Sequence, residues 1–405
     1  MNIAIIGGGA AGFFSAIAAK ENYPESSVTL LEKTQNLLSK VKVSGGGKCN
    51  VTNACFSIKE LSAAYPRGGR QLKKAFNIFS TRDTIAWFEA RGVPLMIRAD
   101  NHVFPTSQDS QSIIDCFLKE AERLGITIEL GARITALKAL GEQIELSFAR
   151  SSLAPEIFDR VIVATGGSPK RSGLEWLEAL NHQIENPVPS LFTFNMPQEP
   201  ITELMGIVAD NAAVSIQGTK LRSSGPLLIT HWGMSGPVIL KLSAFGARVL
   251  SEFDYKFNIQ INWVNEKNTG LVMDLLNETT ELHPNKLLSN FNPFPLPQRL
   301  WLHLLLRSNL GENKKWGELG KKHFNKLVEV VCNDIYQVKD KTTFKEEFVT
   351  CGGVSLKSID FNTMQSKVVK NLYFAGEIMD IDGITGGYNF QSAWTTGYIA
   401  GRLKH

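Results

Sequence analysis

The feature that most constrains this chain is a glycine-rich turn that directly follows its first apolar segment. Residues 2–6 form a short isoleucine-rich run, which is typical of a strand buried on both faces. Gly7, Gly9 and Gly12 come next with G-x-G-x-x-G spacing, and residues 13–20 continue with a helix-like pattern. The sequence therefore predicts a strand, a tight turn and a helix, as at the start of a doubly wound α/β domain.

Each glycine of this turn has a physical role. Gly7 permits the tight turn, Gly9 lets the backbone approach a pyrophosphate, and Gly12 lets the helix pack against the sheet. The helix N-terminus favours a bound pyrophosphate, because its N–H groups are unpaired and its dipole attracts negative charge. A second apolar strand over residues 28–31 ends on Glu32, whose carboxylate can accept hydrogen bonds from ribose hydroxyls. We therefore expect a dinucleotide-binding site here.

The composition is that of an ordinary soluble globular protein. The 405 residues leave room for two or three domains, and 43% hydrophobic and 20% charged residues are usual values. A formal net charge of +4 is too small for this length to indicate a nucleic-acid partner. No apolar stretch approaches the roughly 20 residues of a membrane span, and the N-terminal apolar run is too short for a signal peptide. We therefore expect a protein without a membrane or nucleic-acid partner.

The cysteines bear on metal binding and on the cellular compartment. Five of them are scattered along the chain without metal-ligand spacing or a disulfide framework: Cys49, Cys55, Cys116, Cys332 and Cys351. Reduced thiols in a reducing compartment are the simpler interpretation. We expect a cytoplasmic protein with no metal site.

A second glycine-rich segment lies at residues 37–53, with the sequence LLSKVKVSGGGKCNVTN. Its three glycines are flanked by Ser, Lys, Asn and Thr, so it predicts a loop dense in hydrogen-bond donors, suited to phosphates or to the polar edge of a flavin. Cys49 stands beside Lys48, which could favour a thiolate, although a small packing residue is the commoner role of such a cysteine.

Two further strands are predicted to end in glycines. Residues 161–164 lead into Thr165, Gly166 and Gly167, and residues 372–375 lead into Gly376 and Glu377. Because glycines at the carboxyl end of a buried strand bring backbone close to a ligand, both ends are candidate binding elements. The last segment, residues 380–401, crowds three glycines into a turn and then continues as a helix, which predicts a second site at a helix N-terminus.

Changes in sequence texture predict four segments. The fold class is α/β: a Rossmann-like domain of three layers with a mostly parallel sheet, interrupted by an insertion. Proline-rich sequence near Pro187 and short alternating strands after it predict a small antiparallel β-barrel or sandwich, followed by a helical subdomain. Its lysines are interspersed with acids, which favours a solvated helical surface over a nucleic-acid face. The expected boundaries are 1–187, 188–265, 266–347 and 348–405.

Three side chains are candidate proton donors: His231, Tyr388 and His102. His231 lies in a polar segment, residues 230–237, just before a helix expected to begin near Pro237. A loop histidine is more often hydrogen-bonded within its loop than catalytic. No sequence feature chooses among the three.

Together these segments resemble the two-dinucleotide-binding-domain flavoproteins and, more narrowly, the BaiN/RdsA-type (YhiN-like) NAD(P)/FAD-dependent oxidoreductases. The resemblance extends over essentially the whole chain. Its distinctive motifs are IGGGAAG at 6–12, K-V-x-x-SGGGKCNVTN at 40–53, VIVATGG at 161–167, THWGMSGP at 230–237, TCGGV at 350–354 and LYFAGEIMDIDGITGGYNFQSAWTTG at 372–397.

The resemblance implies a non-covalent FAD in an extended conformation. The first turn would hold its pyrophosphate, Glu32 its adenosine ribose, and backbone near Ile134 its adenine. Lys48 departs from the family, which more often has arginine there, but it keeps the positive charge. The cofactor-binding residues that follow are Gly7, Gly9, Ala10, Ala11, Gly12, Glu32, Lys33, Lys40, Ser44, Gly45, Gly46, Gly47, Lys48, Cys49, Asn50, Ile134, Ala164, Thr165, Gly166, Gly376, Glu377, Asp382, Gly387, Tyr388, Asn389, Phe390 and Gln391.

The resemblance also implies an oxidoreductase. Characterised relatives include reductases of carbon–carbon double bonds conjugated to a carbonyl or aromatic system, so a flavin-dependent reductase of a small molecule is expected. The chain has one complete G-x-G-x-x-G with its downstream acid, and NAD(P)H would therefore visit the flavin transiently. The alternatives are a flavin oxidase, a tRNA-modifying flavoprotein, or a non-catalytic binding protein stabilised by FAD.

Overall fold

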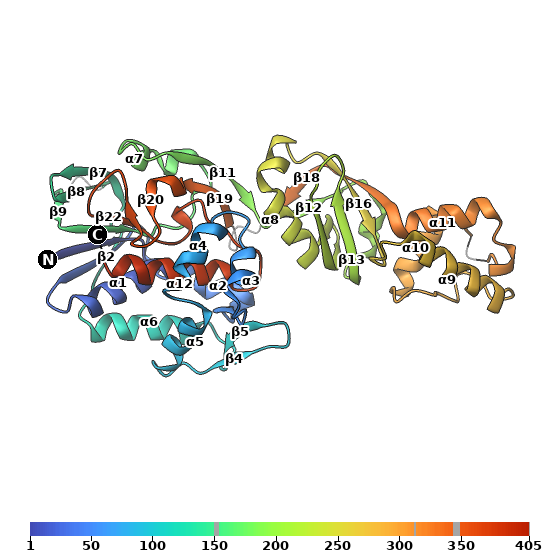
Figure 1. Ribbon diagram of the computed structural model, residues 1–405, viewed down its shortest axis with the longest axis horizontal. Helices are drawn as coiled ribbons and strands as arrows, with labels where there is room; N and C mark the ends of the chain where they lie inside the picture. The colour runs from blue at the N-terminus through green and yellow to red at the C-terminus, as the bar shows by residue number, and fades with distance from the viewer. Residues whose placement is uncertain (150–153, 312, 343–348, 405) are drawn as a thin grey trace. The chain divides into compact units, whose positions relative to one another are not determined.

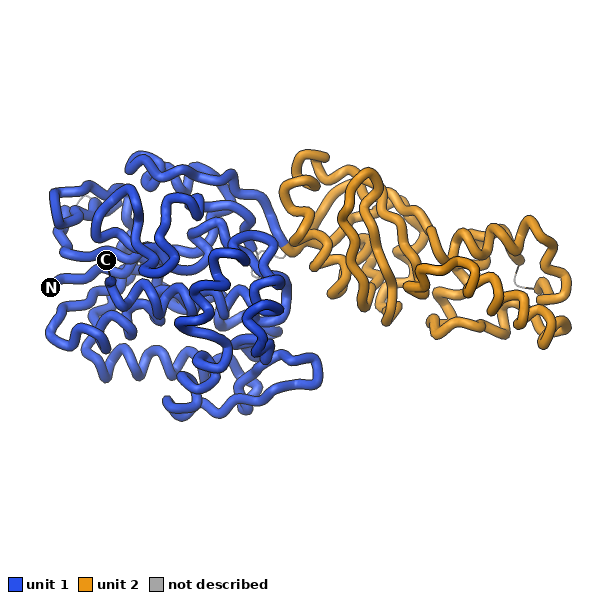
Figure 2. Tube along the Cα trace, in the orientation of Figure 1, with its two compact units in different colours: residues 1–190, 344–405 blue, residues 191–343 orange. Residues whose placement is uncertain are grey.

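A computed structural model describes residues 1–149, 154–311, 313–342 and 349–404 (Figure 1). The chain forms two compact units: unit 1 is Met1–Ser190 with Phe344–His405, and unit 2 is Leu191–Thr343 (Figure 2). Unit 2 is thus inserted into the sequence of unit 1. The four-part division expected from sequence texture remains a prediction.

Unit 1 is built on a seven-stranded sheet, and it confirms the predicted Rossmann-like α/β fold. The strand order is β20-β21-β22-β10-β1-β2-β6, in which β1, β2, β6, β10 and β22 run parallel. The first strand is buried and apolar inside the sheet from its second residue on, which explains the isoleucine run. The bounds are β1 Asn2–Ile6, β2 Ser27–Glu32, β6 Thr127–Leu130, β10 Arg160–Val163, β20 Ile359–Asp360, β21 Gln365–Ser366 and β22 Leu372–Phe374.

Helices cover one face of this sheet and a small antiparallel sheet lies against its central strands (Figure 1). The covering helices are α1 Ala10–Asn22, α6 Gln111–Arg123 and α12 Tyr388–Gly401, and the small sheet consists of β7 Ile134–Leu140, β8 Gln143–Phe148 and β9 Glu156–Phe158. The remaining elements of unit 1 are α2 Ser39–Gly47, β3 Thr52–Asn53, α3 Ile58–Ala63, α4 Gly69–Ala75, α5 Thr81–Glu89, β4 Leu95–Ile97, β5 His102–Pro105, α7 Glu175–Glu178, β11 Ile184–Ser190 and β19 Val349–Val354.

Aromatic side chains fill the space between these helices. Phe14 of α1 contacts Trp87 at a ring-centroid distance of 4.6 Å and Trp394 of α12 at 5.6 Å. Phe117 of α6 lies 5.5 Å from Trp394. These rings are almost fully excluded from solvent, so they tie the first, middle and last parts of unit 1 into one core.

Unit 2 contains an antiparallel sheet that closes on itself. Its strand order is β17-β16-β13-β14-β15-β12-β18, and its two end strands are separated by the single residue Lys339. One chain segment therefore pairs with both edges of the sheet, so that of the two predicted forms, barrel or sandwich, the sheet has the closed one. The bounds are β12 Thr193–Asn195, β13 Val208–Ile216, β14 Arg222–Thr230, β15 Gly233–Ser235, β16 Phe257–Asn262, β17 Asp334–Val338 and β18 Asp340–Thr342.

The helices of unit 2 belong to two cores. Helix α8, Pro237–Glu252, begins at Pro237 as predicted and packs into the barrel core. Helices α9 Thr269–Leu282, α10 Gln298–Arg307 and α11 Lys321–Asn333 enclose a second core around Trp301 and Trp316. The expectation of helical structure up to residue 347 is wrong at residues 334–342. Buried and exposed side chains alternate along β17, which is the pattern of a half-buried strand.

The packing of α12 on α1 predicts the effect of a single methyl group. A Cβ at Gly401 would lie 2.6 Å from the Ala18 Cβ and 2.7 Å from the Ser15 carbonyl oxygen. We expect Gly401→Ala to lower the free energy of unfolding by about 1–3 kcal/mol, because the helices must move apart. Gly311→Ala is the control, since a Cβ there meets nothing within 4 Å. Equal denaturant midpoints for both variants would contradict this packing account.

Candidate cofactor-binding site

A cavity of about 530 Å³ opens at the carboxyl ends of β1, β2 and β10 in unit 1. This is the edge of a parallel sheet at which doubly wound folds bind their ligands. Six of the residues expected to bind the cofactor line it: Gly7, Glu32, Lys33, Ile134, Thr165 and Gly166. The structure therefore brings together the segments predicted for the pyrophosphate, ribose and adenine with the strand end at Thr165 and Gly166, which was predicted to close over the ribityl side.

The glycines of the first turn have distinct roles in the geometry. Gly7 has φ +116°, and a Cβ there would lie 2.5 Å from the Ala164 carbonyl oxygen. A Cβ at Gly12 would lie 1.8 Å from the Gly7 carbonyl oxygen. A Cβ at Gly9 would meet nothing within 4 Å, and no side chain of the described residues caps α1, which starts at Ala10. Gly7 and Gly12 are thus required for close backbone packing, whereas Gly9 faces open space at the start of a helix.

Glu32 is held at the edge of the cavity by neighbouring polar groups. Its Oε2 accepts a hydrogen bond of 2.8 Å from the Gly8 N–H. Its Oε1 accepts from the N–H and hydroxyl of Thr34, at 2.8 and 2.9 Å. The carboxylate is therefore oriented in advance and can still accept from a ribose at Oε2, because that oxygen accepts only one of its two possible hydrogen bonds.

The segment expected to be a loop at residues 37–53 begins as a helix. Helix α2 runs from Ser39 to Gly47 with a kink at residues 44–46, and Gly45, Gly46 and Gly47 have φ between +59° and +83°. A Cβ at Gly46 or Gly47 would meet nothing within 4 Å, so these two leave room for a ligand. The Ser44 hydroxyl donates to the Val41 carbonyl oxygen at 2.9 Å, and Lys48 is exposed.

Cys49 is a packing residue. It is fully buried, and burial raises the pKa of its thiol to about 12. The thiol therefore stays protonated at neutral pH, which answers the question of a thiolate beside Lys48.

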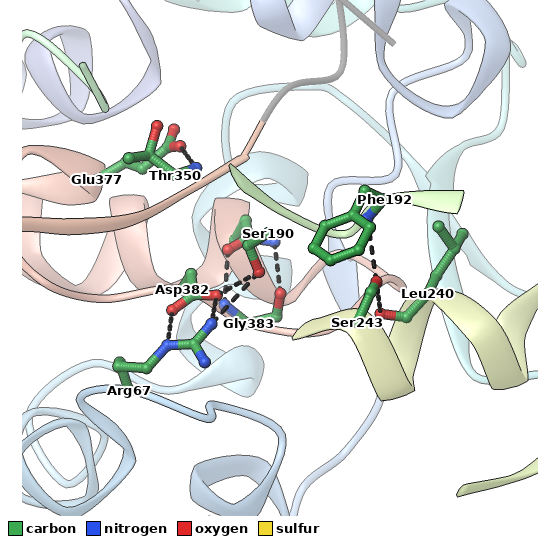
Figure 3. Close-up of polar contacts among 10 residues, drawn as sticks. Arg67, Ser190, Phe192, Leu240, Ser243, Thr350, Glu377, Asp382 and Gly383 are labelled. Carbon is green, nitrogen blue, oxygen red and sulfur yellow. Dashed lines mark hydrogen bonds and ion pairs between the residues drawn. The ribbon is translucent and has the colours of Figure 1, made fainter. Parts of the chain in front are cut away.

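Glu377 links its own segment and Lys40, both predicted to bind the cofactor, to Thr350 of β19. Its Oε2 pairs with Lys40 Nζ at 2.8 Å, and its Oε1 accepts from the Thr350 N–H at 2.7 Å (Figure 3). Gly167 fits closely against the same group, since a Cβ there would lie 2.5 Å from Thr350 Oγ1. Among the described residues, that hydroxyl is buried without a hydrogen-bond partner. A buried, unsatisfied hydroxyl is a candidate contact for a polar ligand.

The last predicted binding element is the N-terminus of α12. Gly387 has φ +87°, and a Cβ there would lie 2.5 Å from Thr52 backbone atoms. Asn50, with its amide oriented to satisfy its neighbours, accepts from the Gly387 N–H at 3.2 Å. The residue that precedes the helix is a glycine and supplies no side-chain cap, so the first N–H groups of α12 can meet a ligand. Gly376 has φ +75°, and a Cβ there would lie 2.8 Å from the Ala11 Cβ.

Three side chains at this end are engaged within the protein. The fully buried Gln391 side chain is hydrogen-bonded to the hydroxyls of Thr52 and Thr84, at 2.6 and 2.9 Å. The Asn389 side chain accepts from the Gly383 N–H at 2.8 Å and donates to its carbonyl oxygen at 3.0 Å. Phe390 stacks on Trp394 at a centroid distance of 5.4 Å. These side chains support the turn.

Asp382 is also engaged within the protein. Its Oδ1 accepts from Arg67 Nε at 2.5 Å, and its Oδ2 pairs with a second Arg67 nitrogen and accepts from the Ser190 hydroxyl at 2.6 Å (Figure 3). Burial raises the pKa of Asp382, and Arg67 opposes that rise. Both carboxylate oxygens thus bond to protein groups and the side chain is fully buried, which disfavours the direct ligand contact that its place in the motif suggested.

The three candidate proton donors lie in different surroundings. His102 Nδ1 is 2.6 Å from Asp100 Oδ2, and a Cβ at Gly386 would lie 2.8 Å from His102 Nε2, so the ring borders the turn before α12. Burial raises the pKa of Tyr388, which begins α12, to about 12. His231 is exposed in unit 2, between β14 and β15, where its ring meets Trp232 edge-on at 4.3 Å.

Several contributing residues were not found from the sequence. Arg67 and Asp100 lie in no recognisable sequence motif. No sequence pattern predicts the hydrogen bond of Thr350 to Glu377, which lies 27 residues farther along. Trp176 lines the 530 Å³ cavity together with Ile134, the predicted adenine contact. The one signal near Arg67 is the glycine pair that follows it, because a Cβ at Gly69 would lie 2.4 Å from the Ser62 carbonyl oxygen.

These residues fit an extended dinucleotide. Open space faces Gly9, Gly46 and Gly166, and two helices begin after glycines that supply no side-chain cap. The fold and this site define a Rossmann-type dinucleotide-binding protein. Within the described ranges, no three His, Cys, Asp or Glu side chains gather as they would around a metal ion. No helix among the described residues is long and apolar enough to cross a bilayer.

The chain belongs to the family of HI0933-like proteins. The family's Rossmann-domain model matches residues 1–403, and the family consists of FAD-dependent oxidoreductases. The chain is 28% identical to a 3-dehydro-bile acid Δ(4,6)-reductase of Clostridium scindens, over 99% of this chain and 98% of that one. It is also 28% identical to a ribosomal RNA dihydrouridine synthase of Escherichia coli, over 97% and 95% of the two chains.

Solved structures support the fold. A 3-ketosteroid Δ4-(5α)-dehydrogenase of Rhodococcus jostii has a TM-score of 0.51 at 13% identity, covering 100% of this chain and 96% of its own. A 3-ketosteroid Δ1-dehydrogenase of Sterolibacterium denitrificans also has a TM-score of 0.51, at 11% identity and 98% coverage of both chains. At this identity the likeness concerns the architecture alone.

The two kinds of glycine in the first turn predict two different mutant phenotypes. We expect Gly9→Ala to leave the melting temperature of the apoprotein unchanged, because the added Cβ meets no protein atom. It should raise the Kd for FAD at least about tenfold, because the methyl group occupies the path of the pyrophosphate. Gly12→Ala is the matched variant that should fail to fold stably. Wild-type FAD affinity in Gly9→Ala would contradict the assignment.

Proposed function

We propose that this protein is an NAD(P)H-dependent reductase of a carbon–carbon double bond conjugated to a carbonyl. The observation that carries the proposal is the pair of full-length relatives, which have different substrates in their names but one kind of reaction. A 3-oxo-Δ4,6 steroid and a uracil ring both hold a double bond conjugated to a carbonyl. Reduction of the double bond next to the carbonyl adds a hydride to the β carbon and a proton to the α carbon.

The division of labour follows from this chemistry. When bound, FAD supplies hydride transfer between a nicotinamide nucleotide and the substrate. The chain itself holds the dinucleotide through the first glycine turn, Glu32, and the N-terminus of α12. It must also provide the proton. The single complete fingerprint supports a nicotinamide nucleotide that visits the site and leaves.

Among the candidate donors we favour His102. Asp100 holds its Nδ1, and Nε2 is directed toward Gly386 at the turn that leads into α12. Although burial opposes it, hydrogen bonds from His102 lower the pKa of Asp100, so this carboxylate remains ionised and keeps the ring oriented. Tyr388 stays a neutral phenol, which suits it to donate a hydrogen bond to a substrate carbonyl rather than to lose its proton.

RNA is the second candidate substrate class, because one relative is named for dihydrouridine in ribosomal RNA. The lysines before and along α11 are the basic group that could contact it. The ion pair of Lys326 with Glu329 at 2.9 Å favours a solvated surface instead. We therefore place a small molecule first.

A substrate panel separates the two classes. The purified holoenzyme would be given NADH or NADPH under anaerobic conditions with a steroid dienone, a simple cyclic enone, free uridine, or unmodified ribosomal RNA. We expect product with an enone and none with RNA, measured by mass spectrometry. Dihydrouridine in RNA, formed at a rate that falls steeply with salt, would favour the RNA function. Reduced product from none of them would contradict the proposed reaction.

Substitution of the donor should separate chemistry from cofactor binding. We expect His102→Gln to lower kcat by about 10²–10⁴-fold while FAD stays bound, since a glutamine fills the site but transfers no proton. Asp100→Asn should cause a smaller loss, because the ring keeps one hydrogen bond. His231→Gln tests the competing donor in unit 2. A wild-type kcat in His102→Gln together with a large loss in His231→Gln would transfer the role to His231.

A further inference from the structure

Arg67, Ser190 and Asp382 form a buried polar triad in unit 1 (Figure 3). Asp382 is fully buried, and the Arg67 side chain is 11% exposed. Arg67 and Ser190 also contact each other, since an Arg67 nitrogen donates to Ser190 Oγ at 3.3 Å. Each group therefore bonds to both of the others, and the geometry of the three is tightly defined.

The triad anchors the turn that precedes α12. Residues 380–387 form this turn, and a β-bridge joins the backbones of Arg67 and Asp382. Farther along, the Ile384 N–H donates to the Ala64 carbonyl oxygen at 3.0 Å, and Asn53 donates to the Gly386 carbonyl oxygen at 3.1 Å. The Asp382 side chain is fully buried, so the loss of a partner would leave an uncompensated charge in the interior and destabilise the turn.

Ser190 brings a separate segment to the same carboxylate. It ends β11, which pairs with β19, and it is the last residue of unit 1 before the chain enters unit 2. Leu191, the next residue, has φ +55°, an uncommon backbone conformation for a side chain of this type. The carboxylate of Asp382 is thus shared by the cofactor turn and by the segment that leads into the insertion.

We propose that Arg67 and Ser190 are positioning residues that act through Asp382 and hold the 380–387 turn and the N-terminus of α12 in the shape that accepts the flavin. The proposal rests on FAD binding and not on the identity of the substrate. Arg67 has the main role, because its two bonds match the charge and the planar shape of the carboxylate. Ser190 keeps the outgoing segment in register with the turn.

Because Asp382 can take up a proton, the FAD affinity of a variant that lacks Arg67 should depend on pH. The groups that face Asp382 are Arg67, Ser190 and the neighbouring carboxylate of Asp380. Removing Arg67 takes away the main opposition to the effect of burial and leaves only the Ser190 hydrogen bond, so the pKa of Asp382 rises further. In Arg67→Met, FAD affinity should therefore be lowest at high pH, where the buried carboxylate is charged, and should recover as pH falls and the carboxyl group takes up a proton.

The test is the Kd for FAD of reconstituted apoprotein between about pH 6 and 9, followed by flavin fluorescence, with the melting temperature of each apoprotein. We expect Arg67→Met to raise the Kd at least about tenfold at the high-pH end and to show the slope described above. Arg67→Met combined with Asp382→Asn should recover most of the affinity and lose the slope, because no charge remains at position 382. Ser190→Ala should raise the Kd only a few-fold.

The chain offers a matched control in unit 2. Arg307 and Asp334 also form a pair with a buried carboxylate, at 2.7 Å. Arg307→Met should lower the melting temperature without changing the Kd for FAD. Arg67→Lys keeps the charge and loses the planar fork, so it should fold, bind FAD several-fold more weakly and show no slope.

Three results would overturn the proposal. These are a wild-type Kd in both Arg67 variants, a double variant that binds FAD no better than Arg67→Met, and an equal loss of affinity in Arg307→Met. The Kd for FAD is measured without turnover, so this proposal can be tested even if the protein reduces no enone.

Discussion

Helix α1 begins directly against the turn that follows β1, and the rest of unit 1 depends on this close approach. A Cβ at Gly12 would lie 1.8 Å from the Gly7 carbonyl oxygen, and one at Gly7 would lie 2.5 Å from the Ala164 carbonyl oxygen. Three strand ends and a helix N-terminus can therefore meet at one edge of the sheet without side chains between them. The cavity and the position of Glu32 at its edge follow from that convergence. Helix α12 packs along α1 beside it.

Much of this arrangement could be predicted from the sequence because it is encoded locally. The isoleucine run, the glycine spacing and the acid at the end of β2 all lie between Asn2 and Glu32, and each imposes a backbone conformation or a buried face. The start of α8 at Pro237 was predictable for the same reason, since proline favours the first turn of a helix. The family resemblance added the identity of the cofactor.

What the sequence did not disclose depends on distant partners. Asp382 stands in a motif that suggests ligand contact, but it is bound by Arg67, which is 315 residues away in the chain. Residues 334–342 were expected to be helical, because their neighbours α10 and α11 are. These residues form strands because they pair with β16 at one edge of the sheet and with β12 at the other. No local sequence pattern predicts that they close the barrel in this way. Gln391 likewise belongs to a predicted cofactor motif, but its side chain binds Thr52 and Thr84.

The proposed reaction requires that electrons from a nicotinamide nucleotide reach an FAD bound in the single dinucleotide-binding site of unit 1. The most direct measurement is anaerobic mixing of the purified holoenzyme with NADH or NADPH while the absorbance of oxidised flavin is followed. We predict rapid bleaching by one of the two nucleotides, and recovery of the absorbance on addition of a conjugated enone. A flavin that dithionite bleaches but neither nucleotide reduces would contradict this mechanism.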